Sequence, residues 1–207
     1  MQIELRQIGK KFNSEWIFRK LDYLFEAQKT TAILGRNGSG KSTLLQVIAG
    51  SMSPNAGTAV YTLSGKPVAE ESVYRYLVLV APYQQLIEEF TLNEMINFHF
   101  SFKSYLQGFN RPKLIDLMQL AGNRDKPLLQ FSSGMKQRVK LALALCSEVP
   151  LILLDEPTMN LDKGGMTWYF QLMDDLGKNR TTIICTNQQE TEAPFAHSIL
   201  TIEQFRQ

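Results

Sequence analysis

The stretch Gly35-Arg36-Asn37-Gly38-Ser39-Gly40-Lys41-Ser42-Thr43 matches the pattern G-x-x-x-x-G-K-[ST] at every defined position. A compact apolar run, Thr30 to Leu34, comes directly before it and reads as a buried strand. A helical pattern over Ser42 to Ala49 comes after it and is closed by Gly50. This strand, loop and helix context is the one in which the pattern binds phosphate.

The chemistry of this loop follows from its residue types. Glycines let successive backbone N–H groups converge on phosphate oxygens, and the helix N-terminus adds the positive end of its dipole. Lys41 is expected to bring its charge to the β and γ phosphates, and the Ser42 hydroxyl to ligate Mg²⁺. The residues expected to bind the nucleotide are Gly35, Arg36, Asn37, Gly38, Ser39, Gly40, Lys41, Ser42 and Thr43.

A pair of carboxylates follows a second apolar strand. Leu151 to Leu154 is wholly apolar and leads directly into Asp155 and Glu156, at the strand end where an open α/β sheet binds its ligands. Because burying adjacent charges is costly without a cation, these residues indicate a Mg²⁺ nearby. We expect Asp155 to hold the metal or its water, and Glu156 to act as the catalytic group that polarises the attacking water.

Composition and charge bound the class of protein. The chain has 207 residues, 44% of them hydrophobic, and a net charge of +2, which gives no basic field of the kind that nucleic-acid binding requires. Cys146 and Cys185 lie in apolar stretches without metal-ligand spacing, so buried free thiols in a reducing compartment are expected. No apolar leader and no run near the ~18 residues of a membrane span occur, so we expect a chain that is neither exported nor membrane-spanning.

Strand and helix patterns alternate along the chain and predict a mostly parallel α/β core in one domain over residues 1–207. The stretch at about residues 83–145 changes character and is expected to be a helical insertion. Helices are predicted at 42–49, 92–102, 112–121, 135–146 and 165–176. Strands are predicted within 3–25 and at 30–34, 58–63, 76–81, 151–154, 181–185 and 198–202.

These motifs resemble the ATP-binding cassette (ABC) ATPase family across essentially the entire chain. Phe131-Ser132-Ser133-Gly134-Met135-Lys136-Gln137-Arg138 is similar to the family signature, and Met159-Asn160-Leu161-Asp162 looks like the family's D-loop. The resemblance implies an ABC-type P-loop fold with a mostly parallel core sheet, an N-terminal antiparallel β region and an inserted α-helical subdomain.

The signature segment implies a dimer. In the family it faces the γ phosphate of the ATP held by the opposite subunit. Here Ser132 offers a hydroxyl, and the amides of Ser133 and Gly134 suit an anion. An ordinary helix N-cap explains the same residues when they are taken alone.

Three positions depart from the family pattern or are ambiguous. Phe12 lies where an aromatic residue stacks on adenine, with Trp16 as the alternative. Tyr83 occupies the place of the Q-loop glutamine, and Gln84 serves as a metal-site residue only after a shift of one position, or else is a plain loop residue. Asn187 aligns with the family's catalytic histidine, and because an amide carries no charge, slower hydrolysis is expected.

Neither histidine of the chain is placed to replace that group. His99 lies in the helical insertion and His197 precedes the last strand, so structural roles are expected for both.

The resemblance also implies a function, and it implies that the protein uses ATP and Mg²⁺ as cofactors. The expected protein is the ATP-hydrolysing subunit of a transporter, which pairs with a second ABC subunit and with a separate transmembrane permease subunit. It is expected to be cytoplasmic, peripheral at the inner face of the membrane, with Leu86, Ile87 and Phe90 able to line the groove for the permease. The alternatives are a soluble ABC ATPase without a transport role and a regulatory cassette that seldom cleaves ATP.

Overall fold

The computed structural model describes residues 1–187 and 192–206 and divides the chain into two compact units. The first unit comprises Met1–Leu79, Pro150–Glu156 and Lys178–Gln207, and the second comprises Val80–Val149 and Pro157–Gly177. The expectation of a single domain over 1–207, with an insertion at about 83–145, stays a prediction.

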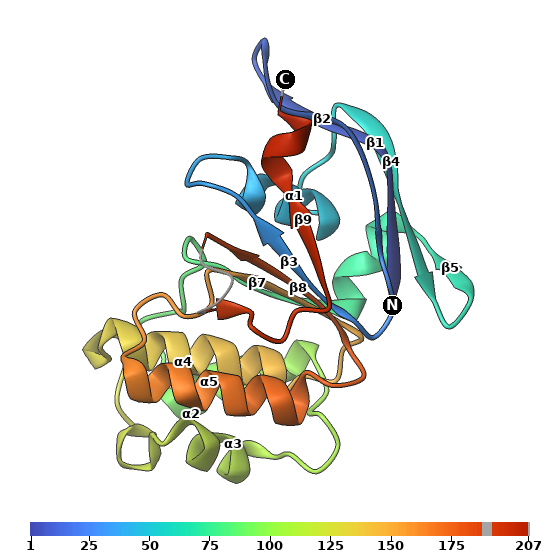
Figure 1. Cartoon of the computed structure of the whole chain (residues 1–207). Helices are drawn as coiled ribbons and strands as arrows, with labels where there is room; N and C mark the ends of the chain where they lie inside the picture. Colours follow the sequence, from blue (N-terminus) through green and yellow to red (C-terminus); the bar gives the residue numbers. More distant parts are fainter. Residues whose placement is uncertain (188–191, 207) are drawn as a thin grey trace. The chain divides into compact units, whose positions relative to one another are not determined.

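A five-stranded sheet holds the phosphate-binding motif in the first unit (Figure 1). Its order is β6-β7-β8-β3-β9, and β3 pairs in parallel with both β8 and β9, as β7 does with β8. The prediction of a mostly parallel core sheet is therefore confirmed. The strands are β3 (Thr30–Leu34), β6 (Leu77–Val80), β7 (Leu151–Asp155), β8 (Thr181–Thr186) and β9 (Ser198–Thr201).

A four-stranded antiparallel sheet is built from the N-terminal part of the first unit, as the resemblance implied. Asn13 turns the first hairpin in a left-handed conformation, φ 53°, which asparagine tolerates better than most residues. The sheet has the order β2-β1-β4-β5, with β1 (Gln2–Phe12), β2 (Glu15–Phe25), β4 (Ala56–Leu63) and β5 (Lys66–Val68).

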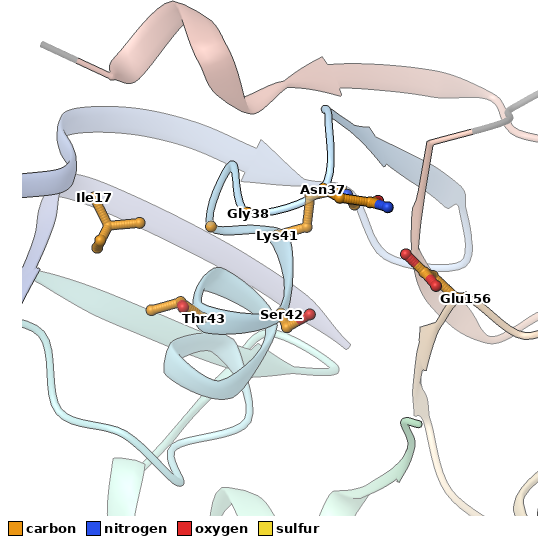
Figure 2. A pocket seen from close by; sticks show the side chains of 8 residues that line it. Ile17, Asn37, Gly38, Lys41, Ser42, Thr43 and Glu156 are labelled. Carbon is orange, nitrogen blue, oxygen red and sulfur yellow. The ribbon is translucent and has the colours of Figure 1, made fainter. Parts of the chain in front are cut away.

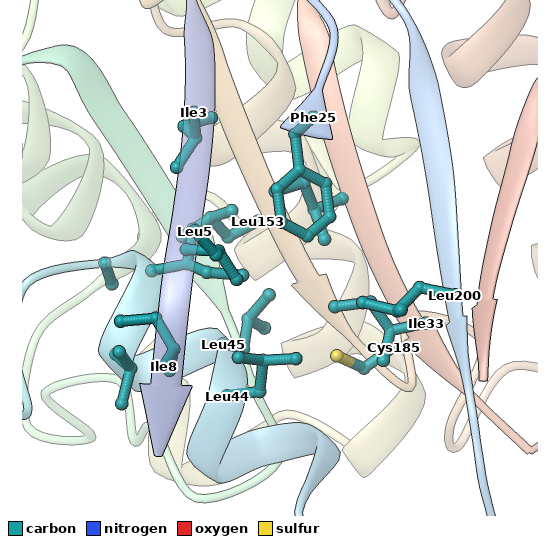
Figure 3. Packing of buried hydrophobic residues seen from close by; sticks show 14 of the residues in the cluster. Ile3, Leu5, Ile8, Phe25, Ile33, Leu44, Leu45, Leu153, Cys185 and Leu200 are labelled. Carbon is teal, nitrogen blue, oxygen red and sulfur yellow. The ribbon is translucent and has the colours of Figure 1, made fainter. Parts of the chain in front are cut away.

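Helix α1 (Lys41–Ile48) contributes to the main core of the first unit. Its Leu44 and Leu45 are fully buried together with side chains of both sheets, such as Leu5 of β1 and Leu153 of β7 (Figure 3). This burial fixes the start of α1, and thereby the loop before it, against the parallel sheet. The described residues of this unit also form the 3₁₀ helices η1 (Glu70–Tyr76) and η4 (Ile202–Phe205).

The second unit contains four α-helices, whose ends are set by capping side chains. Thr91 and Glu94 form a capping box at the start of α2, and Asn110 caps α3. Ser132 caps α4 and Asp162 caps α5 through their side-chain oxygens. The helices are α2 (Leu92–Phe102), α3 (Arg111–Met118), α4 (Ser133–Leu145) and α5 (Lys163–Leu176), with 3₁₀ helices η2 (Ala121–Asn123) and η3 (Leu128–Gln130).

The predicted helices exist, but three boundaries in the second unit were wrong by two residues or more. The helix predicted at 165–176 begins at Lys163, because the side chain of Asp162 caps it by accepting a hydrogen bond from the Gly165 N–H. The helix predicted at 112–121 ends at Met118, because Gln119 adopts a left-handed conformation with φ 61°. The helix predicted at 135–146 begins at Ser133, because Ser132 accepts a hydrogen bond from the Met135 N–H and so sets the start.

Three further expectations concern single residues and the membrane. Cys146 and Cys185 are both buried free thiols, as predicted. His99 shares a 2.8 Å hydrogen bond with Ser147, and His197 accepts one from the Thr30 N–H, so both have structural roles. Within residues 1–187 and 192–206, no helix is long and apolar enough to cross a membrane.

Candidate functional site

A pocket of about 410 Å³ opens in the first unit at the start of α1 (Figure 2). Its walls combine the glycine-rich loop, the first turn of α1 and the end of β7. Figure 2 shows the Ser42 hydroxyl and the Asn37 amide turned toward the side on which Glu156 lies. The lining residues are Ile17, Asn37, Gly38, Gly40, Lys41, Ser42, Thr43 and Glu156.

The backbone of the loop depends on glycine at position 40. Gly40 has φ 101°, and a Cβ there would lie 2.4 Å from Cγ2 of Ile17. No side chain caps α1, so the amides of its first turn have no competing side-chain acceptor. This arrangement suits an anion, because uncapped N–H groups and the helix dipole point to the same place.

The ammonium of Lys41 is directed back along the loop. Its side chain is buried, and Nζ donates to the Gly35 carbonyl at 2.8 Å and to the Arg36 carbonyl at 3.1 Å. These bonds hold the charge beside the first residues of the loop. A phosphate bound by the loop would therefore meet a cation that is already positioned.

The surroundings of Asp155 suit a cation. Only 2% of its surface is exposed, and Oδ1 is buried without a hydrogen-bond partner. Burial raises the pKa of this carboxyl; a hydrogen bond with Ser42 opposes the shift, and the charge of Glu156 adds to it. A Mg²⁺ fits here, because it would satisfy the oxygen and offset the desolvation.

The candidate metal ligands are few, since the Ser42 hydroxyl and the Asp155 carboxylate, which share a hydrogen bond, are the two side chains proposed for this role. Among the residues that the structure describes, no group of three His, Cys, Asp or Glu side chains could hold an ion. Mg²⁺ is commonly bound by only one or two protein groups, with phosphate and water completing its shell.

Glu156 lies at the pocket wall directly after β7. Its backbone is left-handed, φ 46°, which is unusual for a residue with a side chain and adds strain of about 1–3 kcal/mol. The Glu156 N–H donates to the Cys185 carbonyl at 2.9 Å. The chain thus turns sharply at this residue, and its half-exposed side chain lines the pocket.

Asn187 lies next to the glycine-rich loop. Its Nδ2 donates to Oδ1 of Asn37 at 3.1 Å, which links the end of β8 to the pocket. The sequence placed both residues in the site, but it gave no sign of this direct bond.

The two aromatic candidates for the base differ in surroundings. Phe12 is 47% exposed, and the Lys10 ammonium lies 5.4 Å from its ring centroid. Trp16 is half-buried, and the Lys11 ammonium lies 5.5 Å from its ring centroid. Neither residue is among those that line the pocket, so the stacking role of Phe12 stays a prediction.

A second pocket, of about 440 Å³, lies within the second unit. It contains Ser132, Ser133 and Gly134, so the signature segment and the D-loop-like segment meet in one depression. Gly134 allows this, since a Cβ at that position would lie 2.9 Å from the Asn160 carbonyl oxygen. The lining residues are Gln119, Leu120, Ser132, Ser133, Gly134, Met135, Arg138, Asn160, Leu161 and Asp162.

Gln84 belongs to the second unit and folds back on its own loop. Its Oε1 accepts a hydrogen bond from the Ala81 N–H at 3.2 Å. The neighbouring Tyr83 is half exposed. The choice between these two residues for the Q-loop role stays a prediction.

Three residues near these sites were not predicted from the sequence to belong to them. Ile17 lines the first pocket, and only its place in an alternating strand pattern marked it. Glu192 is buried, hydrogen-bonded to Thr186, and its charge raises the pKa of Asp155, although no motif contains it. Gln137 is buried in α4. In the sequence it is one position of the signature-like segment, and nothing there distinguishes it from its neighbours.

The fold and the first pocket define a P-loop protein that binds a nucleotide. The family described as ABC transporter matches residues 18–159. The chain belongs to this family, as one of its ATP-binding components.

Relatives and solved structures agree with this assignment. The sulfate/thiosulfate import ATP-binding protein of Synechococcus elongatus is 34% identical over 96% of this chain and 59% of its own length. The Nod factor export ATP-binding protein I of Sinorhizobium fredii is 31% identical over 92% of this chain and 57% of its own length. The chain therefore spans less than two thirds of these curated relatives.

One solved structure illustrates the shared fold. A dimeric ATP-binding cassette in a post-hydrolysis state, bound to ADP and phosphate, superposes with a TM-score of 0.80 at 22% identity. The match covers 97% of this chain and 94% of that one. It confirms the ABC-type P-loop fold.

Proposed function

We propose that this chain binds and hydrolyses MgATP as the energy-coupling subunit of a transporter whose membrane part is a separate subunit. The observation that carries the proposal is the convergence of Lys41, Ser42 and Glu156 on one pocket at the start of α1. This set supplies a cation for phosphate, a hydroxyl for Mg²⁺ and a carboxylate for water.

Each group has a separate task in the proposed reaction. Lys41 neutralises charge on the β and γ phosphates. Ser42 and Asp155 would hold Mg²⁺, which would supply stabilisation for the charge that develops on the phosphate oxygens. Glu156 orients and polarises the attacking water and accepts its proton. Its strained backbone is consistent with a catalytic position, because strain of this kind is kept where the surrounding structure enforces it.

We further propose that two such cassettes close on ATP. The second pocket presents the N-terminus of α4 with the Ser132 hydroxyl, which suits a phosphate from another subunit. The solved dimeric cassette with the same fold supports this arrangement. A homodimer and a pair with a homologue both satisfy it.

The proposed contact with the permease lies on exposed aromatic residues of the second unit. Phe98 and Phe102 of α2 are 41% and 73% exposed, and Phe90, Phe98 and Phe102 form edge-to-face pairs with ring centroids 5.7 and 5.3 Å apart. Leu86 and Ile87 are half-buried in the loop before them. A helix with an apolar face from a membrane subunit would cover such a surface. This partner would hold the protein at the inner face of the membrane.

We propose a slow turnover, since Asn187 occupies the position of the usual histidine. A neutral amide can donate a hydrogen bond to a phosphate oxygen but cannot move a proton in the physiological pH range.

Phosphate release from purified protein with MgATP, measured for wild type and Glu156→Gln across protein concentration, tests the proposal. We expect a rate per subunit that rises with concentration, and a loss of at least about 100-fold in the mutant with ATP binding retained. Equal rates in both proteins would contradict the role of Glu156.

The same measurement separates the alternatives. Tight ATP binding with no phosphate release at any concentration would favour a regulatory cassette for which ATP is a dimerising ligand. A rate of phosphate release that does not change when purified permease candidates in lipid are added would favour an ABC ATPase without a transport role.

A further inference from the structure

A buried glutamine of α4 contacts the residue that follows the proposed general base. Gln137 is only 6% exposed, and its Nε2 donates to the Pro157 carbonyl oxygen at 2.8 Å. Both residues belong to the second unit. Pro157 is bonded directly to Glu156, so this contact fixes the chain one residue beyond the catalytic carboxylate.

The Glu156 backbone is therefore held on both sides. Its N–H donates to the Cys185 carbonyl at 2.9 Å, and the next carbonyl along the chain accepts from Gln137. Between these two bonds the backbone takes the left-handed conformation, φ 46°. A strained conformation persists only when neighbouring contacts enforce it, and these two contacts are of that kind.

Packing alone does not account for an amide at position 137. The neighbouring side chains Val139, Leu141 and Ala142 of α4 are fully buried and apolar. Burying an unpaired amide costs about 1–3 kcal/mol, and a hydrogen bond offsets that cost without adding much net stability. A methionine of similar length would fill the same space. Compared with methionine, glutamine adds a side-chain N–H that can donate to the Pro157 carbonyl oxygen.

The N-terminus of helix α4 also lines the second pocket. Its N-cap Ser132 and its first-turn residue Gly134 line that pocket, and Gln137 lies about one turn further along the same helix. A rigid helix thus connects the proposed site for the partner's phosphate with the backbone next to Glu156.

We infer that Gln137 is a positioning residue, which sets the direction of the Glu156 carboxylate and links it to the phosphate site at the N-terminus of α4. This inference rests on the proposed ATP hydrolysis.

The test compares Gln137→Met with Gln171→Met, a matched change at an exposed position of α5. The methionine keeps the length of residue 137 and removes the donor. Because small displacements of a catalytic group lower rates by up to about 100-fold, we expect kcat to fall at least about tenfold in Gln137→Met. We expect KM and the Kd for MgATP to stay within about twofold, and Gln171→Met to behave as wild type.

A second variant provides a rescue. Gln137→Glu keeps the shape and can donate to Pro157 only when its carboxyl is protonated, which burial favours. The ratio of its kcat to that of wild type should rise as the pH falls from about 8 to about 5.5. A merely structural role gives no such rise. This variant also carries the test if Gln137→Met fails to fold.

The outcomes distinguish this inference from the function on which it rests. A Gln137→Met enzyme with the kcat of Gln171→Met, or a Gln137→Glu ratio that does not rise toward low pH, overturns the positioning role alone. If neither wild type nor Glu156→Gln releases phosphate, both the positioning role and the proposed ATP hydrolysis are overturned.

Discussion

Asn187 donates from Nδ2 to Oδ1 of Asn37 at 3.1 Å, which joins the residue after β8 to the middle of the glycine-rich loop. The bond lies beside the pocket that Asn37 lines. It holds the amide of Asn187 close to the place where we propose that the terminal phosphate binds.

Replacing Asn187 tests whether this amide limits turnover. We expect Asn187→Ala to lower kcat by about three- to tenfold, because one hydrogen bond worth about 1 kcal/mol is lost. Asn187→His should raise kcat, since imidazole can carry charge and move a proton near neutral pH. Phosphate release at saturating MgATP measures both.

The double variant with Asn37→Ala is the control for the bond itself. If the two side chains act together, the double variant should lose little more than Asn187→Ala alone. An Asn187→His enzyme with unchanged or lower turnover would count against the proposed reason for slow hydrolysis.

Asp155→Asn should separate metal binding from fold stability. Burial raises the pKa of Asp155, so the charged form destabilises the metal-free protein increasingly as the pH rises above the ordinary carboxyl range. We expect the Asn variant to be more stable than wild type near pH 7 without nucleotide. It should also lose the stabilisation by MgATP, about 2.7 kcal/mol for a ligand at 100 times its Kd.

Thermal unfolding with and without MgATP measures both effects. Asp175→Asn, at an exposed position of α5, is the matched control and should respond to MgATP as wild type does. Undiminished stabilisation of Asp155→Asn by MgATP would contradict a role for Asp155 in the metal site.

The parts of the fold that were predictable are those that local sequence determines. The apolar run Leu151 to Leu154 and the glycine-rich loop have few alternative structures, and helix α2 was predicted with both of its ends correct. The helix ends at Gln119 and Ser132 depended on one backbone conformation and one capping bond, which apolar periodicity does not show.

The contacts within the candidate site were less predictable because they join residues far apart in sequence. The bond between Asn187 and Asn37 and the bond between Gln137 and Pro157 each require the tertiary fold. Glu192 illustrates the same limit, since its charge raises the pKa of Asp155 only because the fold places it beside Thr186 of β8, and no motif contains it.

Gly134→Ala should impair the second pocket. The added Cβ would lie 2.9 Å from the Asn160 carbonyl oxygen, so the signature segment and the D-loop-like segment would have to separate. We expect a loss of about 1 kcal/mol in stability and a loss of the concentration-dependent part of the ATPase rate. ATP binding to the monomer should not change.

Gly122→Ala is the matched control, since a Cβ there would meet nothing within 4 Å. Urea unfolding and phosphate release across protein concentration measure the two effects. If Gly134→Ala keeps the concentration dependence of wild type, the second pocket is not part of the dimeric site.

Phe12→Ala tests the proposed adenine platform. Stacking of a base on an aromatic ring is worth about 1–3 kcal/mol, so ATP should bind about 5- to 100-fold more weakly. Tripolyphosphate has no base and should bind to the variant as it does to wild type. Titration calorimetry measures both ligands. The same loss in Trp16→Ala, with Phe12→Ala unaffected, would assign the platform to Trp16.

His99 should make the fold sensitive to mild acid. Burial lowers its pKa to about 4, the charge of Lys103 adds to this shift, and a hydrogen bond with the Leu143 backbone opposes it. In the unfolded chain His99 binds a proton as the pH falls through about 6.5, whereas in the folded protein it stays neutral until the pH is much lower. Stability is therefore fully present above about pH 6.5 and is lost as the pH falls toward about 4, by up to about 3 kcal/mol.

Urea unfolding of wild type and His99→Gln between about pH 7 and about pH 4.5 measures this contribution. Glutamine can still bond to Ser147 but does not titrate in this range, so the variant should lose about 2–3 kcal/mol less than wild type on acidification. His99 lies outside both pockets, and its replacement should leave the Kd for MgATP near pH 7 unchanged. Parallel stability profiles for the two proteins would show that His99 is protonated in the folded state and that its burial imposes no such cost.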